Sequence, residues 1–380
     1  MSDDPSNALM RNCDRLKICV GFGLQIWTNP DENLSISLRL FRAICHIDFA
    51  NHGRNHLYNS RNEVSVVTGA NKGIGLEICR QLASNGITVI LTARDEIKGA
   101  RAVEALKISR PTDVIFHQLD VNDATSVTSL AGFIKTRYGK LDILVRKKTR
   151  IVLKNFYKFR APNYFEQVNN AGDNGVRLKI SEEAMKDLNF QFGDEKDEIA
   201  KLLEESIEDT YERAKQSIET TYYGTKRVTE ALLPLLQLSN SARIVNVSSV
   251  YGQLKFISNE TIKEELRNVD CLTVEKIYEL MHKFLKDFKD GMLETNGWPV
   301  LISAYKVSKA AITAYTRILA RKFPSLCVNA VHPGLVKTDI SFHQGNLTPD
   351  EGAKAPVMVA LLPSDGPSGF YFDQMEISTF

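Results

Sequence analysis

Tyr305 and Lys309 are four residues apart in SAYKVSKAAITAYTRILARKF, residues 303–323, where the spacing of apolar residues predicts a helix. Side chains four positions apart on a helix project from the same face. A free tyrosine titrates near pH 10, and a nearby ammonium stabilises the charged form, which makes the proton easier to exchange near neutrality. The pair is therefore a candidate for general acid catalysis with Tyr305 as the proton donor.

The same Tyr-x-x-x-Lys spacing occurs three more times: Tyr211 with Lys215, Tyr222 with Lys226, and Tyr251 with Lys255. The first two pairs lie on a charged, helical stretch, and the third falls in a turn just after a strand. Only Tyr305 opens a long amphipathic helix, behind Ser303 as a possible N-cap and before small alanines that allow close packing against a cofactor. We expect the other three pairs to have structural or surface roles.

Three glycines, Gly69, Gly73 and Gly75, separate the apolar strand VSVVT from a helical stretch. Glycine suits such a turn because the backbone must turn tightly and let a pyrophosphate approach the helix N-terminus. Its position between the first strand and the first helix predicts a dinucleotide site, which also includes Ile74.

Two basic residues refine the expected cofactor. Lys72 lies within the glycine turn, and Arg94 follows the second strand. NAD sites usually have an acid after this strand to accept from the ribose hydroxyls, whereas an arginine accommodates a 2′-phosphate. The sequence thus favours NADPH/NADP, and the alternative is that both residues are solvated surface charges.

From residue 63 onward, β-branched runs alternate with helical stretches, which predicts an α/β fold with a doubly wound parallel sheet covered on both faces. Expected strands include DVIFHQL, LDILV, ARIVNVSS and CVNAVHP, and expected helices include residues 95–107 and 124–138. Residues 1–62 show no sustained period and are expected to be a poorly ordered N-terminal extension. A charged segment, Leu254 to Trp298, is an expected helical insertion.

The motifs TGANKGIG, NNAG, VNVSS, SAYKVSK and HPG follow one another in an order that resembles the short-chain dehydrogenase/reductase family across residues 63–380, most closely its carbonyl reductase branch. The resemblance implies a single Rossmann-fold domain that reduces a ketone or aldehyde with NADPH, and catalyses the reverse oxidation. It also implies a bulky apolar substrate of terpenoid or alkaloid type. The Leu254–Trp298 insertion would roof the active site and cover the surface that shorter relatives use to oligomerise, which implies a monomer.

The resemblance also assigns roles to residues. Ser249 would hydrogen-bond the substrate carbonyl with Ser248 in support, Tyr305 would be the acid, and Lys309 would hold the nicotinamide ribose. Further cofactor contacts would come from Asp120 at the adenine, Asn169 of the NNAG turn, Pro333, Gly334, Val336, and Thr338 on the carboxamide side. One position departs from the family: Thr221 stands where relatives usually carry an asparagine that helps to hold a proton-relay water.

Composition limits the other functions. Lys and Arg number 48 against 46 Asp and Glu, for a net charge of +2, so no global field favours nucleic acid or acidic membranes. No apolar run has the length of a membrane span, and the first residues lack a basic secretory region. The six cysteines show neither a metal-site nor a disulfide pattern. We expect a cytoplasmic protein without a metal ion, a membrane anchor or a nucleic-acid partner.

Residues 146–168 interrupt the family pattern between LDILV and NNAG. Removing Arg146 to Val168, or equally Val145 to Gln167, restores a continuous strand and its cofactor turn. The segment carries seven basic residues and one acid, and we interpret it as foreign to the domain, able to displace Asn169 or obstruct the nicotinamide. Two alternatives remain open: a catalytically impaired nucleotide-binding protein of the same fold, and RNA or anionic-lipid binding by the basic, aromatic run RKKTRIVLKNFYKFR.

Overall fold

The computed structural model describes residues 63–109, 113–147, 176–178, 207–341 and 345–380. Within these ranges, the main sheet has eight strands in the order β10-β9-β8-β7-β4-β1-β2-β3, parallel except for the β9–β10 pair. The strands are β1 (Val64–Thr68), β2 (Thr88–Ala93), β3 (Val114–Gln118), β4 (Ile143–Arg146), β7 (Arg243–Val247), β8 (Cys327–His332), β9 (Tyr371–Asp373) and β10 (Glu376–Ser378). This confirms the α/β fold with a doubly wound sheet.

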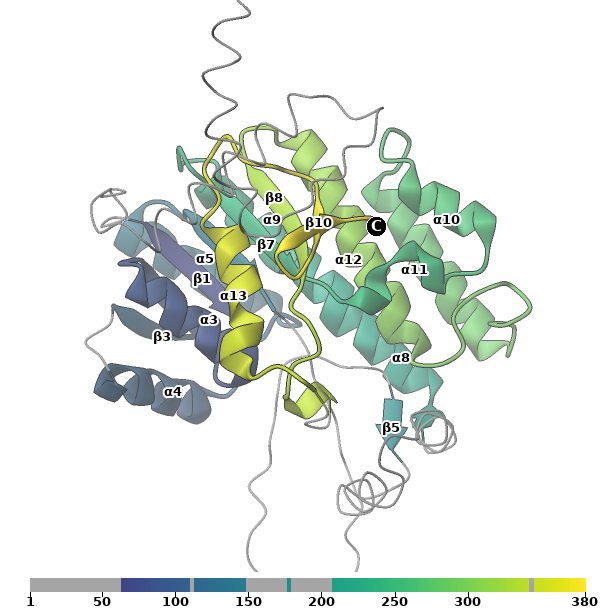
Figure 1. The fold of residues 1–380 in the computed structure, drawn as a ribbon, viewed down its shortest axis with the longest axis horizontal. Helices are drawn as coiled ribbons and strands as arrows, with labels where there is room; N and C mark the ends of the chain where they lie inside the picture. Colours follow the sequence, from purple (N-terminus) through teal and green to yellow (C-terminus); the bar gives the residue numbers. More distant parts are fainter. Residues whose placement is uncertain (1–62, 110–112, 148–175, 179–206, 342–344) are drawn as a thin grey trace, which may run out of the picture.

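Helices cover both faces of the sheet (Figure 1). One face packs against α3 (Gly73–Ser84), α4 (Glu96–Ser109) and α13 (Pro349–Ala360). The other packs against α5 (Ala124–Tyr138), α9 (Gly224–Leu236) and α12 (Ser303–Lys322). All five residues of β1 are buried and three are valines: Val64 and Val66 join one core and Val67 the other.

The chain reverses its direction of winding between β1 and β4. From β1 it proceeds to β2 and β3 on one side, and from β4 to β7 and β8 on the other. Ligands of doubly wound sheets bind at the carboxyl edge of the sheet, at the place where the strand order reverses. The ends of β1 and β4 therefore line the predicted cofactor site.

Several expected boundaries agree with the structure. Helix α5 covers residues 124–138 as expected, and β3 and β8 fall within the expected runs. The charged stretch before β7 contains α8 (Tyr211–Ile218), a π-helix η2 (Glu219–Tyr223) and α9, in one continuous helical segment. It is preceded by β6 (Ile207–Asp209), which pairs with β5 (Val176–Leu178) in a separate two-stranded sheet.

The expected insertion contains the 3₁₀ turn η4 (Leu254–Phe256) and the helices α10 (Glu260–Arg267) and α11 (Val274–Lys289). Both helices lie beside α12 (Figure 1). Arg317 of α12 donates to the backbone oxygen of Arg267 at 2.8 Å, which ties the end of α10 to α12. The Trp298 indole donates to Asp287 of α11 at 2.8 Å and closes the segment.

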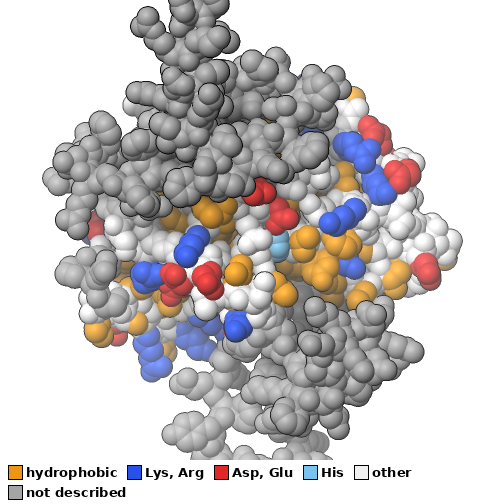
Figure 2. Space-filling model, in the orientation of Figure 1, with side chains coloured by type: hydrophobic (Ala, Val, Ile, Leu, Met, Phe, Trp, Pro, Cys, Tyr) orange, Lys and Arg blue, Asp and Glu red, His pale blue; other side chains and the backbone are white. Residues whose placement is uncertain are grey.

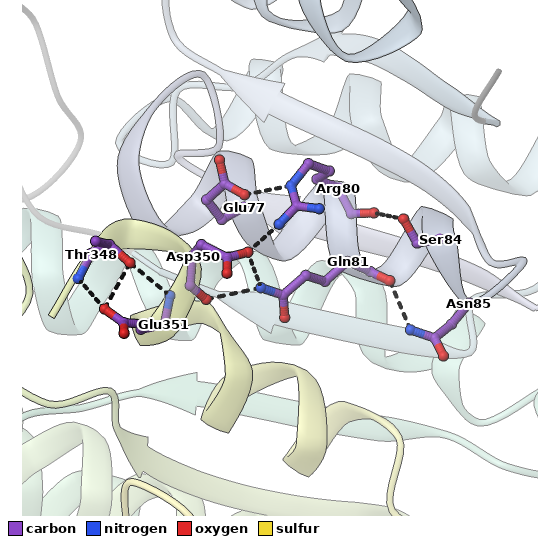
Figure 3. A network of polar contacts seen from close by, with 8 residues as sticks. All are labelled: Glu77, Arg80, Gln81, Ser84, Asn85, Thr348, Asp350 and Glu351. Carbon is purple, nitrogen blue, oxygen red and sulfur yellow. Dashed lines mark hydrogen bonds and ion pairs between the residues drawn. The ribbon is translucent and has the colours of Figure 1, made fainter. Parts of the chain in front are cut away.

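Helix α13 is joined to α3 by a polar network (Figure 3). Asp350 accepts from Arg80 and from Gln81, the latter at 3.0 Å. Thr348 and Glu351 form a capping box that starts α13. The loop between β8 and α13 is thereby held close to the helix that begins at the glycine turn.

Surface charge is mixed, as the composition predicts. Figure 2 shows acidic and basic side chains interspersed on one face, with a group of hydrophobic side chains near its middle. None of the helices in the described ranges is long and apolar enough to cross a membrane.

Candidate active site

The glycine turn has the backbone that a close phosphate approach requires. Gly69 and Gly73 have φ values of 59° and 56°, in the left-handed region that favours glycine. A Cβ on Gly75 would lie 2.7 Å from the Gly69 carbonyl oxygen, so only glycine allows α3 to start this close to β1. Ile74 is buried behind the turn. The N-terminus of α3, with its free N–H groups, therefore points into the crevice.

The charged residues around the glycine turn differ in whether they already have a bonding partner. Lys72 forms an ion pair with Asp339, so binding a 2′-phosphate would require it to share or leave that partner. Arg94 is exposed just after β2. Asp120 follows β3, and its Oδ1 accepts from the Asn122 backbone at 3.0 Å.

The loop after β8 supplies the opposite wall. Gly334 has a φ of 87°, and a Cβ there would lie 2.4 Å from a Leu347 side-chain carbon. Val336 is buried, and Thr338 is only 5% exposed, with its side chain next to Gly73. The structure thus brings Thr338 and Gly334, which follows Pro333, to the same edge of the sheet as the glycine turn.

Ser249 begins the 3₁₀ turn η3 (Val250–Gly252) after β7, where its Oγ accepts from the Tyr251 backbone at 3.2 Å. Its carbonyl accepts from the Tyr371 hydroxyl at 3.1 Å. Ser248 Oγ lies 2.9 Å from Thr313 Oγ1 on α12, so it braces the turn from behind. A Cβ on Gly252 would lie 3.0 Å from Lys309, which explains how this turn approaches α12 so closely.

Tyr305 lies near the start of α12 and forms a side-chain hydrogen bond with Ser249. Burial raises the pKa of the Tyr305 hydroxyl to about 12, and the hydrogen bond with Ser249 opposes this increase. The expected lowering of the Tyr305 pKa by Lys309 is not found, and burial is the largest influence on it. Tyr305 is thus held protonated at neutral pH, as a proton donor must be.

Lys309 lies one helical turn further along α12. Its Nζ is 5.6 Å from the Tyr305 ring centroid and donates to the Val247 carbonyl at 2.8 Å. Burial lowers the Lys309 pKa to about 7, and the positive charge of Lys147 adds to this effect. Tyr305 and Lys309 therefore lie side by side as predicted, but the Lys309 amine is only partly protonated at neutral pH.

The start of α12 is positioned by a contact that the sequence did not reveal. Ser303 does not serve as the N-cap; the helix begins at Ser303 itself, after Ile302 with a φ of 45°. Asp209 of β6 accepts from the Ser303 hydroxyl at 2.8 Å and from its backbone N–H at 3.3 Å. A carboxylate at a helix N-terminus is favourable, and this one fixes the turn that carries Tyr305.

Of the other Tyr-x-x-x-Lys pairs, those of Tyr211 and Tyr222 lie apart from this arrangement, whereas Tyr251 adjoins it through its backbone contact with Ser249. Tyr222 is fully buried in the core, edge-on to Tyr315. Tyr211 packs near Phe288 of α11. Tyr251 is 40% exposed and packs against Phe256, near the mouth of the site.

Thr221 lies in the π-helix η2 and is 1% exposed. Its hydroxyl has no hydrogen-bond partner within the described part of the chain. π-Helical turns frequently occur at functional sites, and the orphaned hydroxyl leaves a donor and an acceptor free for a water. Asn169, the NNAG residue, lies outside the described residues.

The end of β4 is occupied by Arg146 from the interrupting segment. Arg146 is paired with Thr68 of β1 and Asn246 of β7, and it is 3% exposed. Its guanidinium donates to the Thr225 carbonyl at 2.6 Å and to the Asn246 side chain. Both acceptors are neutral, and burial lowers the Arg146 pKa to about 10. A buried cation without a carboxylate is costly, which is consistent with a segment foreign to the domain.

Lys147, the next residue, was not anticipated as part of the site. It is 7% exposed, and its Nζ lies 3.6 Å from where a Cβ on Gly73 would be. Burial lowers its pKa to about 8, with Asp339 raising it and Lys72 lowering it. No sequence signal pointed to Lys147, because its placement depends on the strand continuing into the interruption.

These residues fit a dinucleotide. The glycines of the turn carry no side chains of their own, and the turn leads into the N-terminus of α3. The Thr338 side chain and the Lys147 amino group lie next to Gly73. Gly69, Gly73 and Gly75 would hold the phosphates, and Thr338 and Lys309 would contact the nicotinamide end.

Comparisons with known proteins decide the family. Residues 63–189 match the family model for short chain dehydrogenases. The chain is 49% identical over 322 residues to salutaridine reductase of Papaver bracteatum, covering 83% of this chain and 96% of that protein. The chain belongs to the short chain dehydrogenase family.

Two further family members agree. The chain is 46% identical over 327 residues to (+)-neomenthol dehydrogenase of Capsicum annuum, covering 83% of this chain and 97% of that protein. The solved structure of salutaridine reductase from Papaver somniferum matches with a TM-score of 0.70 and 48% identity, over 82% of this chain and 99% of that one. The resemblance seen in the motifs is therefore confirmed, and this short chain dehydrogenase is an oxidoreductase that uses a nicotinamide cofactor.

Proposed function

We propose that residues 63–380 form an NADPH-dependent reductase domain that converts a ketone or aldehyde to an alcohol, and runs in reverse as a dehydrogenase. The observation that carries the proposal is Tyr305, which is hydrogen-bonded to Ser249 and one helical turn from Lys309. The three side chains come from two elements, and both reach the carboxyl edge of the sheet beside the glycine turn.

In this proposal the bound nicotinamide supplies a hydride to the carbonyl carbon and is thereby oxidised. Ser249 holds the carbonyl oxygen through a hydrogen bond. Tyr305 donates its proton to that oxygen as negative charge develops on it. Lys309 binds the nicotinamide ribose and, when charged, stabilises the tyrosinate that remains.

The substrate class follows from the relatives and from the rim of the site. The relatives are named for salutaridine and neomenthol, and we infer a bulky apolar, terpenoid- or alkaloid-like carbonyl compound here. Leu335 and Met375 are 58% and 49% exposed beside the Gly334 turn, and apolar side chains at a rim suit such a substrate.

The remaining expectations belong to the same proposal. We propose a cytoplasmic monomer, with residues 1–62 as an extension outside the reductase domain. The packing of α10 and α11 along α12 supports a monomer, since the insertion covers that side of the fold.

The proposal is tested by a screen of NADPH oxidation at 340 nm with the purified full chain and a panel of cyclic terpenoid and alkaloid ketones. We expect ketone-dependent oxidation with at least one bulky apolar ketone. NADPH binding without oxidation by any carbonyl compound would instead favour a nucleotide-binding protein that has lost turnover.

Replacing Arg94 with aspartate is expected to reverse the cofactor preference toward NADH. The change removes the proposed 2′-phosphate partner and introduces an acid suited to a free ribose hydroxyl. The measurement is the ratio of kcat/KM for NADPH and NADH, with Arg101→Asp on the exposed side of α4 as the control of equal charge change. An unchanged ratio in Arg94→Asp would show that Arg94 is only a surface charge.

A further inference from the structure

We propose that Lys147 binds the pyrophosphate of the dinucleotide, as a phosphate ligand that this chain has in addition to the glycine turn. The inference rests on the proposed function, because it requires a dinucleotide in the crevice. It concerns a residue outside the motifs that carry the family resemblance.

The backbone of Lys147 is fixed at the end of β4. Its N–H donates to Thr68 Oγ1 at 3.1 Å, and its carbonyl accepts from the same hydroxyl at 3.0 Å. Thr68 is the last residue of β1, immediately before Gly69. The two contacts therefore join the end of β4 to the start of the glycine turn, and the Lys147 side chain leaves from that point.

The ammonium of Lys147 is directed at the N-terminus of α3. Nζ lies 3.6 Å from the position of a Cβ on Gly73, the first residue of this twelve-residue helix. The residue is 93% buried, and within the described ranges no hydrogen bond or ion pair reaches its Nζ. An ammonium on a largely buried side chain has lost much of its hydration, so an anion bound beside it would stabilise its charged form.

The surrounding charges also favour an anion. Lys309 and Lys72 both approach Lys147 closely enough for their charges to repel. The facing acid, Asp339, is already paired with Lys72. A helix N-terminus adds positive potential at the same point, so an anionic group bound there would relieve the repulsion among the three amines.

A pyrophosphate fits this location better than a 2′-phosphate. Lys147 Nζ and the Thr338 side chain both lie within 4 Å of where a Cβ on Gly73 would be, and Lys147 is close enough to Lys309 for its charge to lower the Lys309 pKa. Arg94 follows β2, on the opposite flank of β1 from β4. Both NADPH and NADH carry the pyrophosphate, whereas NADPH alone carries the 2′-phosphate.

The test compares the full chain with Lys147→Met, which keeps an unbranched side chain one heavy atom shorter and removes its charge. Dissociation constants for NADPH and NADH are measured by fluorescence titration, without a carbonyl substrate. We expect both to rise at least ~10-fold, with their ratio unchanged. Inorganic pyrophosphate should compete with NADPH in the unmodified chain and compete weakly in the variant. Lys337→Met, an exposed lysine near Thr338, is the control and should leave both constants unchanged.

Each other outcome would overturn the inference. Unchanged or tighter binding in Lys147→Met would mean that the ammonium is irrelevant or obstructs the cofactor, and a loss for NADPH alone would place Lys147 at the 2′-phosphate. Lys147→Arg keeps the charge and should retain more affinity than Lys147→Met if both variants fold with the melting temperature of the parent. Should the unmodified chain bind neither dinucleotide, the proposed function itself would fail, and this result is distinct from a failure of the Lys147 proposal.

Discussion

Tyr305→Phe is expected to lower kcat for ketone reduction by at least ~100-fold while leaving the fold and NADPH affinity intact. The substitution removes only the hydroxyl, which forms the hydrogen bond with Ser249 and is protonated at neutral pH. The ring remains in place beside Lys309, so packing at the start of α12 is retained. Steady-state kinetics and NADPH titration measure the two quantities separately.

The other three tyrosines with the same spacing are matched controls for Tyr305. Tyr211→Phe, Tyr222→Phe and Tyr251→Phe should change kcat little. Tyr251 contacts Ser249 through its backbone N–H, which phenylalanine keeps, and the hydroxyls of Tyr211 and Tyr222 lie away from Ser249. For Tyr222 the hydroxyl is buried without a partner in the described part of the chain, so its removal should be tolerated. Similar losses in all four variants would mean that Tyr305 is not the acid.

Deletion of residues 146–168 is expected to raise kcat by ~10-fold to ~100-fold, because misplacement of a reacting group by about 1 Å can cost catalysis 100-fold. The deletion joins Val145 to Asn169 and puts a neutral amide at the strand position now taken by Arg146. It also removes the charge of Lys147, which lowers the pKa of Lys309. Lys309 should then be more fully charged at neutral pH and stabilise the tyrosinate better.

The prediction concerns kcat and not the affinity for NADPH. The deletion removes Lys147 and puts the NNAG turn in its place, and these two changes have opposite effects on cofactor binding. Closing a loop of this length costs little entropy. A gain in kcat would therefore come from the changed residues at the end of β4 and not from the shorter chain. Arg146→Asn with Lys147→Asn in the full chain separates these effects and should recover part of the gain. If the deletion variant folds and loses its activity, the segment is a functional part of the enzyme and its interpretation as foreign is wrong. The natural transcript should also often lack the segment.

The fold and the central residues of the site were predictable because their signals are local. The glycine turn follows a strand buried on both faces, and Tyr305 differs from the other tyrosines by opening a long amphipathic helix. Both features could therefore be recognised in the sequence from neighbouring residues alone. The expected helix at residues 124–138 likewise begins after an N-cap, Asp123, and ends before a glycine in the left-handed conformation.

Features that depend on long-range packing were not predictable. Asp209 reaches the start of α12 across 94 positions of the chain, so a local reading favoured Ser303 as the cap. The pKa of Tyr305 depends mainly on burial, which only the folded packing reveals. The placement of Lys147 depends on β4 continuing for one residue into the interruption, whereas the motif pattern ended the strand at Val145. The antiparallel pair β9–β10 completes the sheet from residues that carry no strong strand signal.

The transfer of deuterium to a ketone from NADPH that carries deuterium at both hydrogen positions of nicotinamide C4 tests the central claim most directly, because it follows the hydride itself whichever of the two is transferred. The full chain, the 146–168 deletion and Tyr305→Phe would each be incubated with labelled NADPH and the best ketone of the panel, and the alcohol analysed by mass spectrometry. We predict deuterium on the carbinol carbon with the full chain, more product per unit time with the deletion, and at least ~100-fold less with Tyr305→Phe. Alcohol without deuterium, or NADPH binding with no alcohol formed by either the full chain or the deletion, would contradict the account.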